Sequence, residues 1–259
     1  MRKMLFLLSA VSVLSLQSVQ AQQSDPVQLM DKSRDLTMSG NIQSTVSLTI
    51  TEKNGAVRTR KLNMITKSYD DGTIKRMVKF LDPADVRGTA MLIIDNKSTQ
   101  DDMWIYLPAL KKTRRIVSTE KGKSFMSSEF SNADMSSGSN TDFRMRHTPE
   151  SGQGGTWVIE SVPVNDDKAD EYGFSRKITY LETGTLKTKK IDFYNFDNEL
   201  FKTIEVLDTR PLTGKEGYVM TDMLARNHLN GRSSRVRFDQ VNTSATIPDN
   251  TFSVESLAR

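Results

Sequence analysis

The stretch Ile42-Gln43-Ser44-Thr45-Val46-Ser47-Leu48-Thr49-Ile50-Thr51 decides the class of fold. Apolar residues alternate with polar ones along it, namely Ile42, Val46, Leu48 and Ile50 against Gln43, Thr45, Ser47, Thr49 and Thr51. Successive side chains of a strand point to opposite faces. This period of two therefore predicts an antiparallel strand with one buried face and one wet face.

Runs of the same character continue almost to the end of the chain. They are Val57–Lys67, Ile74–Leu81, Ala90–Asp95, Met103–Leu107, Thr113–Thr119, Thr156–Val162, Phe174–Glu182, Lys187–Asn195, Leu200–Leu207, Tyr218–Arg226 and Ser234–Gln240. Turn signals such as Lys53-Asn54-Gly55, Asp70-Asp71-Gly72 and Asn230-Gly231 separate them. About a dozen strands with short links predict one large meandering sheet. The lack of a βαβ rhythm argues against dinucleotide-binding architectures.

Two segments interrupt this strand pattern. Asp25 before Pro26 is typical of a helix start, and helix formers continue over Val27–Leu36, so we expect one opening helix. The second segment runs over residues 122–155 and is rich in Ser, Gly and Asn. It nevertheless contains apolar side chains and Ser131-Asn132-Ala133-Asp134, which resembles a helix cap. We expect a loop with a short helix there, ordered as a lid.

The first residues have the pattern of a targeting segment. Arg2 and Lys3 precede an apolar run over Met4–Leu16, and Val19-Gln20-Ala21 places small residues at the positions that a signal peptidase reads. We predict a signal peptide over residues 1–21, a single domain over residues 22–259, and a periplasmic location. Removal of Arg2 and Lys3 would lower the formal net charge from +4 to +2.

The composition excludes several kinds of chemistry. The 259 residues include no Cys and only two His, His147 and His228. Disulfides, cysteine nucleophiles, iron–sulfur clusters and cysteine zinc sites are therefore excluded, and a His-rich metal centre is disfavoured. We expect no cofactor and no metal.

No combination of residues resembles an active site. The pairs Asp70-Asp71, Asp101-Asp102 and Asp166-Asp167 are adjacent in sequence, and adjacent side chains diverge, so they do not form an acid/base pair. The glycines in residues 151–155 lack the spacing of a phosphate loop. Neither histidine has a second histidine or a nucleophile motif near it. We therefore predict that the protein is not an enzyme.

Several strands are apolar on both faces. Met91-Leu92-Ile93-Ile94, the run Met103–Leu107 and the run Ile191–Phe196 all show this pattern. A sheet with two apolar faces needs cover on both sides or a sheltered cavity. These residues are thus either ordinary core under covering helices or the lining of a curved sheet that holds an acyl chain.

The densest basic cluster consists of Lys111, Lys112, Arg114 and Arg115, directly after an apolar strand. Nucleic-acid binding would require a higher net charge, so we expect no nucleic-acid partner. Two interpretations remain. The cluster is a solvated hairpin, or it contacts lipid phosphates or an acidic patch of a partner.

The chain resembles the LolA-like family of outer-membrane lipoprotein-sorting proteins over essentially the whole predicted mature part, most specifically between residues 80 and 135. The similar stretches are Phe80-Leu81-Asp82-Pro83, Arg87-Gly88-Thr89-Ala90, residues 102–116, Ser124-Phe125-Met126-Ser127-Ser128-Glu129-Phe130-Ser131, and Asp134-Met135. The family usually reads Phe-Met-Gly-Ser-Asp-Phe-Ser in the fourth of these, so Ser127 replaces Gly and Glu129 replaces Asp. Because glycine tolerates positive φ, the serine disfavours such a turn at this position. The similarity is strongest to a branch associated with RND-type exporters.

This resemblance implies a mainly β protein with a strongly curved antiparallel sheet. The sheet would form an incomplete barrel, with an N-terminal helix and a loop and short-helix lid over the concave face. It implies a soluble periplasmic carrier that binds acyl chains of lipoproteins or lipids and passes them to an outer-membrane acceptor. The alternative is an accessory subunit of an RND-type inner-membrane exporter that carries no lipid.

The resemblance also indicates which residues would serve the carrier. The expected lipid contacts are Trp104, Tyr106, Leu107, Phe125, Met126, Phe130 and Met135, and the expected rim or partner contacts are Lys111, Lys112, Arg114 and Arg115. No transmembrane segment is expected in the mature chain.

Overall fold

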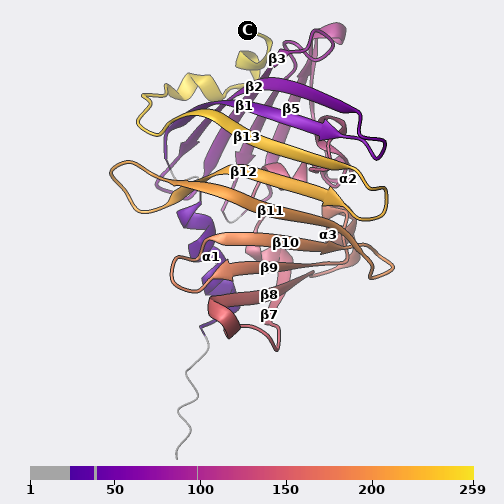
Figure 1. The fold of residues 1–259 in the computed structure, drawn as a ribbon. Helices are drawn as coiled ribbons and strands as arrows, with labels where there is room; N and C mark the ends of the chain where they lie inside the picture. Colours follow the sequence, from indigo (N-terminus) through magenta and orange to yellow (C-terminus); the bar gives the residue numbers. More distant parts are fainter. Residues whose placement is uncertain (1–23, 38–39, 98) are drawn as a thin grey trace, which may run out of the picture.

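A computed structural model describes residues 24–37, 40–97 and 99–259, so the predicted signal peptide lies outside the described residues. Within those ranges, thirteen strands form one antiparallel sheet in the order β6-β5-β4-β3-β2-β1-β13-β12-β11-β10-β9-β8-β7 (Figure 1). The strands are β1 (Ile42–Thr51), β2 (Val57–Ser68), β3 (Ile74–Asp82), β4 (Ala90–Asp95), β5 (Asp102–Leu107), β6 (Lys112–Arg115), β7 (Phe143–His147), β8 (Thr156–Pro163), β9 (Arg176–Glu182), β10 (Thr188–Tyr194), β11 (Leu200–Pro211), β12 (Tyr218–Asn227) and β13 (Ser233–Asn242).

The helices are short and lie between or beside the strands. The α-helices are α1 (Pro26–Leu36), α2 (Ser118–Lys121) and α3 (Asp166–Tyr172), and the 3-10 helices are η1 (Pro108–Leu110), η2 (Phe125–Ser127), η3 (Ala133–Met135), η4 (Asn140–Asp142), η5 (Gln153–Gly155), η6 (Asp249–Phe252) and η7 (Val254–Ala258). The side chain of Asp25 accepts a hydrogen bond of 2.9 Å from the backbone N–H of Val27. The predicted opening helix is confirmed, with Asp25 as its cap and Pro26 at its first turn.

The period of two in the opening stretch is realised as β1. Ile42, Val46, Leu48 and Ile50 are no more than 2% exposed, whereas Gln43 faces solvent. β1 pairs with β2 on one side and with β13, near the other end of the chain, on the opposite side. A local pattern therefore supplies a strand that lies at the middle of the sheet.

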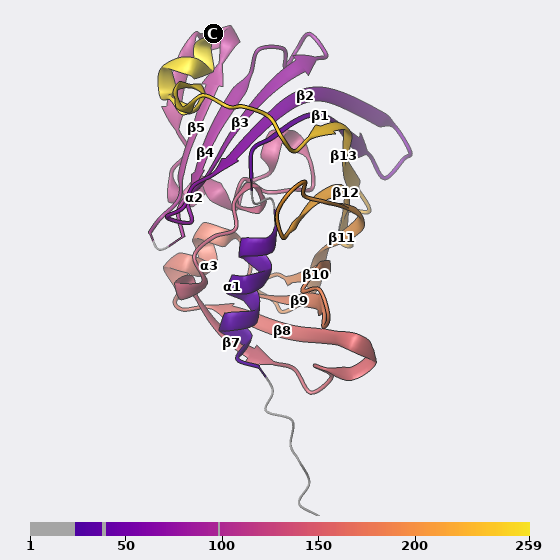
Figure 2. The same cartoon turned by 90° about the vertical axis from the view of Figure 1, so that its left-hand side faces the viewer.

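The sheet curves strongly but does not close. β6 and β7 are its two edges, and Figure 2 shows the strands curling around α1 from one edge to the other. β-bulges interrupt the ladder in β1, β10 and β11. Since a bulge bends its strand and increases the local twist, these irregularities account for much of the curvature. The predicted fold class, an incomplete antiparallel barrel, is confirmed.

Two predictions of secondary structure were wrong. β7 (Phe143–His147) lies inside the segment expected to be a loop, where Phe143 is buried and Arg144 and Arg146 are exposed. This alternation is too short to stand out among the surrounding Ser and Gly. In addition, the run Thr113–Thr119 stays extended only to Arg115, and α2 begins at Ser118.

A buried ion pair joins α2, which follows β6, to α3. Lys121 at the end of α2 bonds to Glu171 in α3 over 2.7 Å, and both side chains are nearly inaccessible. A charged pair of this kind forms only between elements that the tertiary structure brings together. Sequence periodicity contains no information about it.

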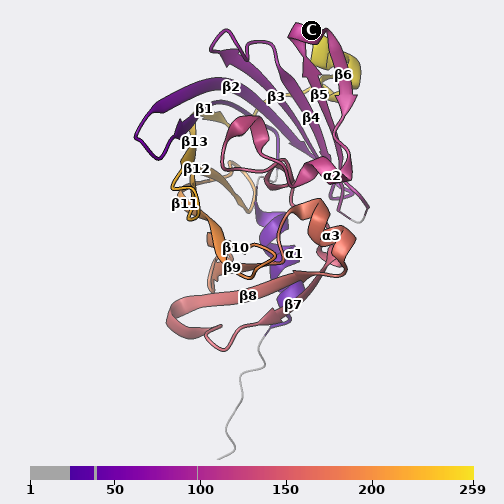
Figure 3. The ribbon, with the colours of Figure 1, turned by 90° about the vertical axis from the view of Figure 1, so that its right-hand side faces the viewer.

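Both faces of the sheet are covered. The concave face is covered by α1, by α3 and by residues 122–142. We call residues 122–142 the inner cover, and Figure 3 shows this segment inside the curve of the sheet. The convex face of β3–β5 is covered by residues 245–258, which we call the outer cover (Figure 2). In β4, Met91 and Ile93 face inward, whereas Ala90 and Leu92 pack beneath the outer cover. The two apolar faces predicted for this strand thus have two different covers.

Candidate functional site

An apolar cavity of about 240 Å³ lies between the concave face of the sheet and its covering segments. Each inner strand contributes alternate side chains, for example Leu48 from β1, Leu62 from β2 and Phe238 from β13. The opposite wall comes from α1, α3 and the inner cover. The same period of two that forms the sheet therefore gives the cavity its apolar lining.

Methionines are frequent in the wall. Those that line the cavity are Met30, Met64, Met135, Met220 and Met223. A methionine side chain is unbranched and flexible, so it adapts to ligands of irregular shape. This wall can repack around chains of different length without a change in the sheet.

The inner cover is held in place by its own hydrogen bonds. The backbone N–H of Phe125 donates to the carbonyl of Phe130 over 2.7 Å. The backbone N–H of Ser131 donates to Asp134 Oδ2 over 2.7 Å, and the N–H of Asp134 donates back to Ser131 Oγ over 3.2 Å. This reciprocal cap starts η3 and confirms the predicted short helix.

A left-handed turn lies within the inner cover. Met126 and Ser127 have φ values of 49° and 60°. The turn that Ser127 disfavours is thus present, and arginines hold it: Arg60 donates to the carbonyl of Met126, and Arg232 donates to that of Ser127 over 2.9 Å. Contacts from the sheet therefore maintain a conformation that serine alone would avoid.

The predicted cavity residues divide into three groups. Phe125, Phe130 and Met135 line the cavity. Leu107 and Met126 pack against the hydrophobic core on the concave side of the sheet but do not line the cavity. The expected position of Trp104 and Tyr106 in the cavity was wrong.

Strand alternation explains this correction. In β5, Met103 and Ile105 point into the inner core. Trp104 and Tyr106 point the other way and pack beneath the outer cover. Trp104, Tyr106 and Met103 are all apolar, so the sequence of β5 did not reveal which face would border the cavity.

The basic cluster lies on an edge of the sheet. Lys111, Lys112, Arg114 and Arg115 are exposed on the turn after η1 and on the edge strand β6. Arg114 forms an ion pair of 2.6 Å with Glu120, and Arg115 pairs with Asp102. None of the four side chains lines the cavity, and their role as rim or partner contacts stays a prediction. Charged edge strands resist pairing with other chains, which is one function of such a cluster.

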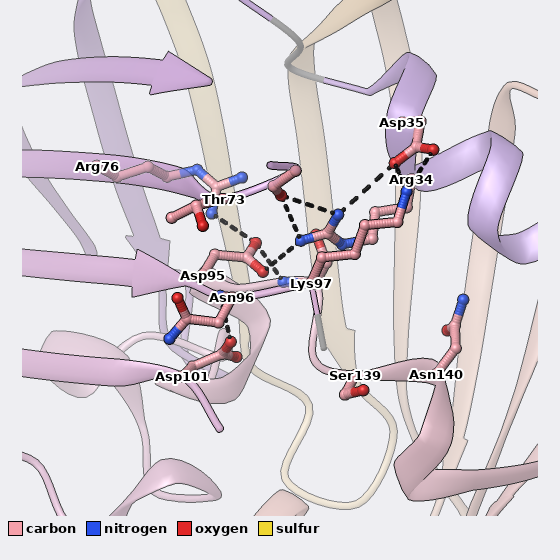
Figure 4. A network of polar contacts seen from close by, with 12 residues as sticks. Arg34, Asp35, Thr73, Arg76, Asp95, Asn96, Lys97, Asp101, Ser139 and Asn140 are labelled. Carbon is pink, nitrogen blue, oxygen red and sulfur yellow. Dashed lines mark hydrogen bonds and ion pairs between the residues drawn. The ribbon is translucent and has the colours of Figure 1, made fainter. Parts of the chain in front are cut away.

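A buried polar network joins α1, the sheet and the inner cover (Figure 4). The carboxylate of Asp95, at the end of β4, is fully buried and accepts from Arg34 over 3.0 Å and from Arg76 over 3.3 Å. It also accepts from the backbone N–H of Ser137 over 2.9 Å, and Arg76 donates to the carbonyl of Met135 over 2.8 Å. One carboxylate thus links the helix, two strands and the cover.

Asp101 lies beside this network and has a perturbed pKa. Its carboxylate accepts from the backbone N–H of Asn96 over 2.9 Å. Burial, followed by the nearby charge of Asp95, raises the pKa of Asp101 from 3.8 to about 6. The inner cover is therefore connected to a group that titrates at mildly acidic pH.

Lys177 in β9 brings a charged group into the apolar cavity. Its Nζ atom lies 4.6 Å from the centre of the Phe143 ring and 5.8 Å from that of Phe174. Burial lowers the pKa of Lys177 to about 8, while Asp134 acts to raise it and Lys202 to lower it. Burial is the largest cause because removal of the ammonium group from water disfavours its charged form.

Sequence reasoning missed Lys177 and the arginines of the network. The available signal was a charged residue on the inward-facing side of a strand, since Lys177 shares its face with Thr179 and Leu181.

The two histidines do not line the cavity. His147 Nδ1 lies 2.7 Å from Ser151 Oγ, and His228 Nε2 lies 2.9 Å from Thr203 Oγ1.

Among the described residues, no group of three or more His, Cys, Asp or Glu could hold a metal ion. In the same part of the chain, every helix is too short or too polar to cross a lipid bilayer.

Comparisons with known proteins agree with this geometry. A family model described as that of an uncharacterized protein matches residues 72–259. No curated protein matches the chain.

Three solved structures are similar over almost the whole chain. A putative outer-membrane lipoprotein-sorting protein domain from Vibrio parahaemolyticus is 26% identical, with a TM-score of 0.79 over 90% of this chain and 97% of that one. A DUF1329 family protein from Desulfovibrio piger is 24% identical, with a TM-score of 0.78 over 89% and 97%. A LolA superfamily protein from Nitrosomonas europaea shares the fold at 16% identity, with a TM-score of 0.65 over 87% and 96%.

Proposed function

We propose that the chain, which shares its fold with a putative outer-membrane lipoprotein-sorting protein domain, is a non-catalytic carrier of acyl chains in the periplasm. The observation that carries this proposal is the apolar cavity between the curved sheet and the inner cover. Its cargo is an acylated lipoprotein or a lipid. Delivery is towards the outer membrane.

The energetics of transfer support a carrier. Burial of a methylene group contributes about 0.8 kcal/mol, so an apolar wall compensates a chain for leaving the bilayer. The cavity of about 240 Å³ is slightly smaller than the roughly 300–1,000 Å³ typical of sites for small molecules. To admit a long acyl chain, the methionines that line the cavity and the inner cover must therefore shift and enlarge it. Release of the chain requires the cavity to contract again.

The carrier requires a donor at the inner membrane and an acceptor at the outer membrane. The resemblance points to an RND-type inner-membrane exporter as donor and to an outer-membrane protein as acceptor. The exposed cluster Lys111, Lys112, Arg114 and Arg115 would contact such a partner, or lipid phosphates, from outside the cavity.

Native mass spectrometry of the protein purified from a periplasmic extract tests the proposal. We expect an added mass that corresponds to a bound lipid or acyl chain, and saturable binding of a fluorescent fatty acid by the delipidated protein. Met223→Trp fills the cavity and should weaken this binding, whereas Leu229→Trp changes a side chain that is 59% exposed and should not. A ligand-free protein that also fails to bind the fluorescent probe would refute the proposal.

A second candidate function is that of an accessory subunit that docks on an exporter without carrying lipid. The exposed position of the basic cluster on the edge strand favours it, because these side chains offer a partner a charged surface that does not involve the cavity. Charge reversal at Lys111, Lys112, Arg114 and Arg115 should abolish co-purification with a membrane partner if docking depends on these residues. Retained docking after charge reversal would count against this role for the cluster.

A further inference from the structure

The charges inside the cavity are few and mostly compensated. The charged residues that line it are Arg34, Arg76, Asp134 and Lys177. Arg34 and Arg76 share the carboxylate of Asp95. Asp134 forms an ion pair of 2.7 Å with Lys202, and both of these side chains are largely buried.

Lys177 differs from the other three. Within residues 24–37, 40–97 and 99–259, its ammonium group has no hydrogen bond and no ion pair with a side chain. Its contacts are the faces of the Phe143 and Phe174 rings. Aromatic faces attract a cation but provide no charge to neutralise it.

An uncompensated cation in an apolar site is costly, and the cost falls when a ligand supplies the missing anion. The carboxylate of Asp134 is already paired with Lys202, so it neutralises Lys177 only in part. The positive charge of Lys202 repels that of Lys177. Tyr172 of α3 lies beside both rings, but its hydroxyl group donates to Asp142 over 2.8 Å. The protein thus leaves the ammonium group of Lys177 to be paired by something else.

We propose that the cavity binds a single acyl chain that ends in a small anionic head group of the carboxylate type, and that the ammonium group of Lys177 pairs with this head group. The proposal rests on the proposed carrier function and adds the chemical class of its ligand. The chain would lie along the apolar wall that includes Ile191 and Phe193 on the neighbouring strand β10.

The size of the cavity favours a carboxylate over a larger head group. The ammonium group lies against the Phe143 and Phe174 rings in a space of about 240 Å³, and the polar side chains elsewhere in the lining are small or, like Arg76 and Asp134, already paired. A glycerol-linked head group would bring several polar atoms into this space with few partners, which is unfavourable. A carboxylate brings two oxygen atoms, and an ammonium group with three donors can satisfy them.

The test compares ligands of equal chain length that differ only in the head group. A fatty acid, the corresponding fatty alcohol and the corresponding monoalkyl phosphate are titrated at pH 7 into the delipidated full-length mature protein. We expect the acid to bind about tenfold more tightly than the alcohol or better, since a hydrogen bond to a charged group contributes more than a neutral one. Tighter binding of the phosphate than of the acid would overturn the assignment to a carboxylate.

Two variants with the same change of side chain localise the effect. Lys177→Met should reduce the affinity for the acid to that for the alcohol and leave the alcohol affinity unchanged. Lys189→Met removes the same charge from an exposed position on β10 and should leave both affinities unchanged. Melting temperatures measured without ligand establish that each variant is folded.

The outcomes separate this inference from the function on which it rests. If acid and alcohol bind the wild type equally, or if Lys177→Met preserves their difference, the role of Lys177 is refuted while the carrier function stands. If neither ligand binds the wild type, the carrier function itself fails.

Discussion

The inner and outer covers lie on opposite faces of the same sheet. Each combines apolar packing, as at Phe125 and Phe252, with polar contacts, as at Arg76 and Lys67, but in the described part of the chain only the inner cover is contacted by buried arginines. The outer cover is attached by apolar packing, with Leu257 and Phe252 almost fully buried against β3–β5. The inner cover leaves a cavity beneath it and is held by buried arginines, since Arg60 and Arg76 donate to its carbonyls. The outer cover therefore completes a solid core, whereas the inner cover encloses the cavity.

The largest expected effect comes from the centre of the polar network. Asp95→Ala leaves Arg34 and Arg76 buried without their carboxylate, and we expect it to destabilise the fold by about 3–5 kcal/mol. Urea unfolding measures this. Asp249→Ala removes a carboxylate that is 72% exposed from its pair with Lys67 and should cost less than about 1 kcal/mol. Equal effects of the two substitutions would contradict the central role of Asp95.

Truncation in the outer cover should separate stability from binding. Leu257 is 1% exposed, so Leu257→Ala is expected to cost about 2–5 kcal/mol in the free energy of unfolding. Because the outer cover does not line the cavity, the affinity of the folded protein for an acyl ligand should be unchanged. Leu229→Ala at an exposed position is the matched control. A loss of affinity in folded Leu257→Ala would show that the two covers are coupled.

Lys177→Met is expected to increase the stability of the ligand-free protein. Burial lowers the pKa of Lys177 from 10.5 to about 8, so the unfolded chain holds this proton more tightly than the folded protein does. The charged lysine therefore opposes folding below pH 8, and stability increases as the pH rises from about 8 to 10.5. At pH 7 we expect the methionine variant to be more stable by on the order of 1–3 kcal/mol. Thermal unfolding at pH 7 and pH 10 tests this, since the difference between the proteins should shrink at the higher pH.

Asp101→Asn should produce the smallest effect, confined to one range of pH. The pKa of Asp101 is raised to about 6, so the folded protein binds this proton more tightly than the unfolded chain. Its contribution to stability therefore falls as the pH rises from about 3.8 to 6. The difference in stability between variant and wild type should change between pH 4 and pH 7 by on the order of 1 kcal/mol, in favour of the variant at pH 7. Asp197→Asn in an exposed turn should show no such change.

The comparison of the covers also shows what sequence patterns can predict. The helix start at Asp25 and Pro26, the cap from Ser131 to Asp134 and the strand Ile42–Thr51 depend on neighbours within a few residues. Their outcomes matched the predictions because these interactions are local. β7 and α2 did not match, because a five-residue alternation is weak and because the pair Lys121–Glu171 joins distant segments.

The candidate site was predicted in part for the same reason. The family resemblance placed Phe125, Phe130 and Met135 at the cavity, and the structure brings them to its wall. Trp104 and Tyr106 lie on the other side of β5, and no sequence pattern distinguishes two apolar faces of one strand. Lys177 was overlooked, since an inward-facing lysine becomes significant only when the space around it is known.

The sequence by itself determined the class of fold, because the period of two along each strand is a property of neighbouring residues. It also determined the absence of thiol chemistry, because the chain has no Cys. Only the tertiary structure decided which apolar face became solid core and which became cavity. That choice depends on where the chain end and residues 122–142 pack, and these contacts join residues far apart in sequence, beyond the reach of any local pattern.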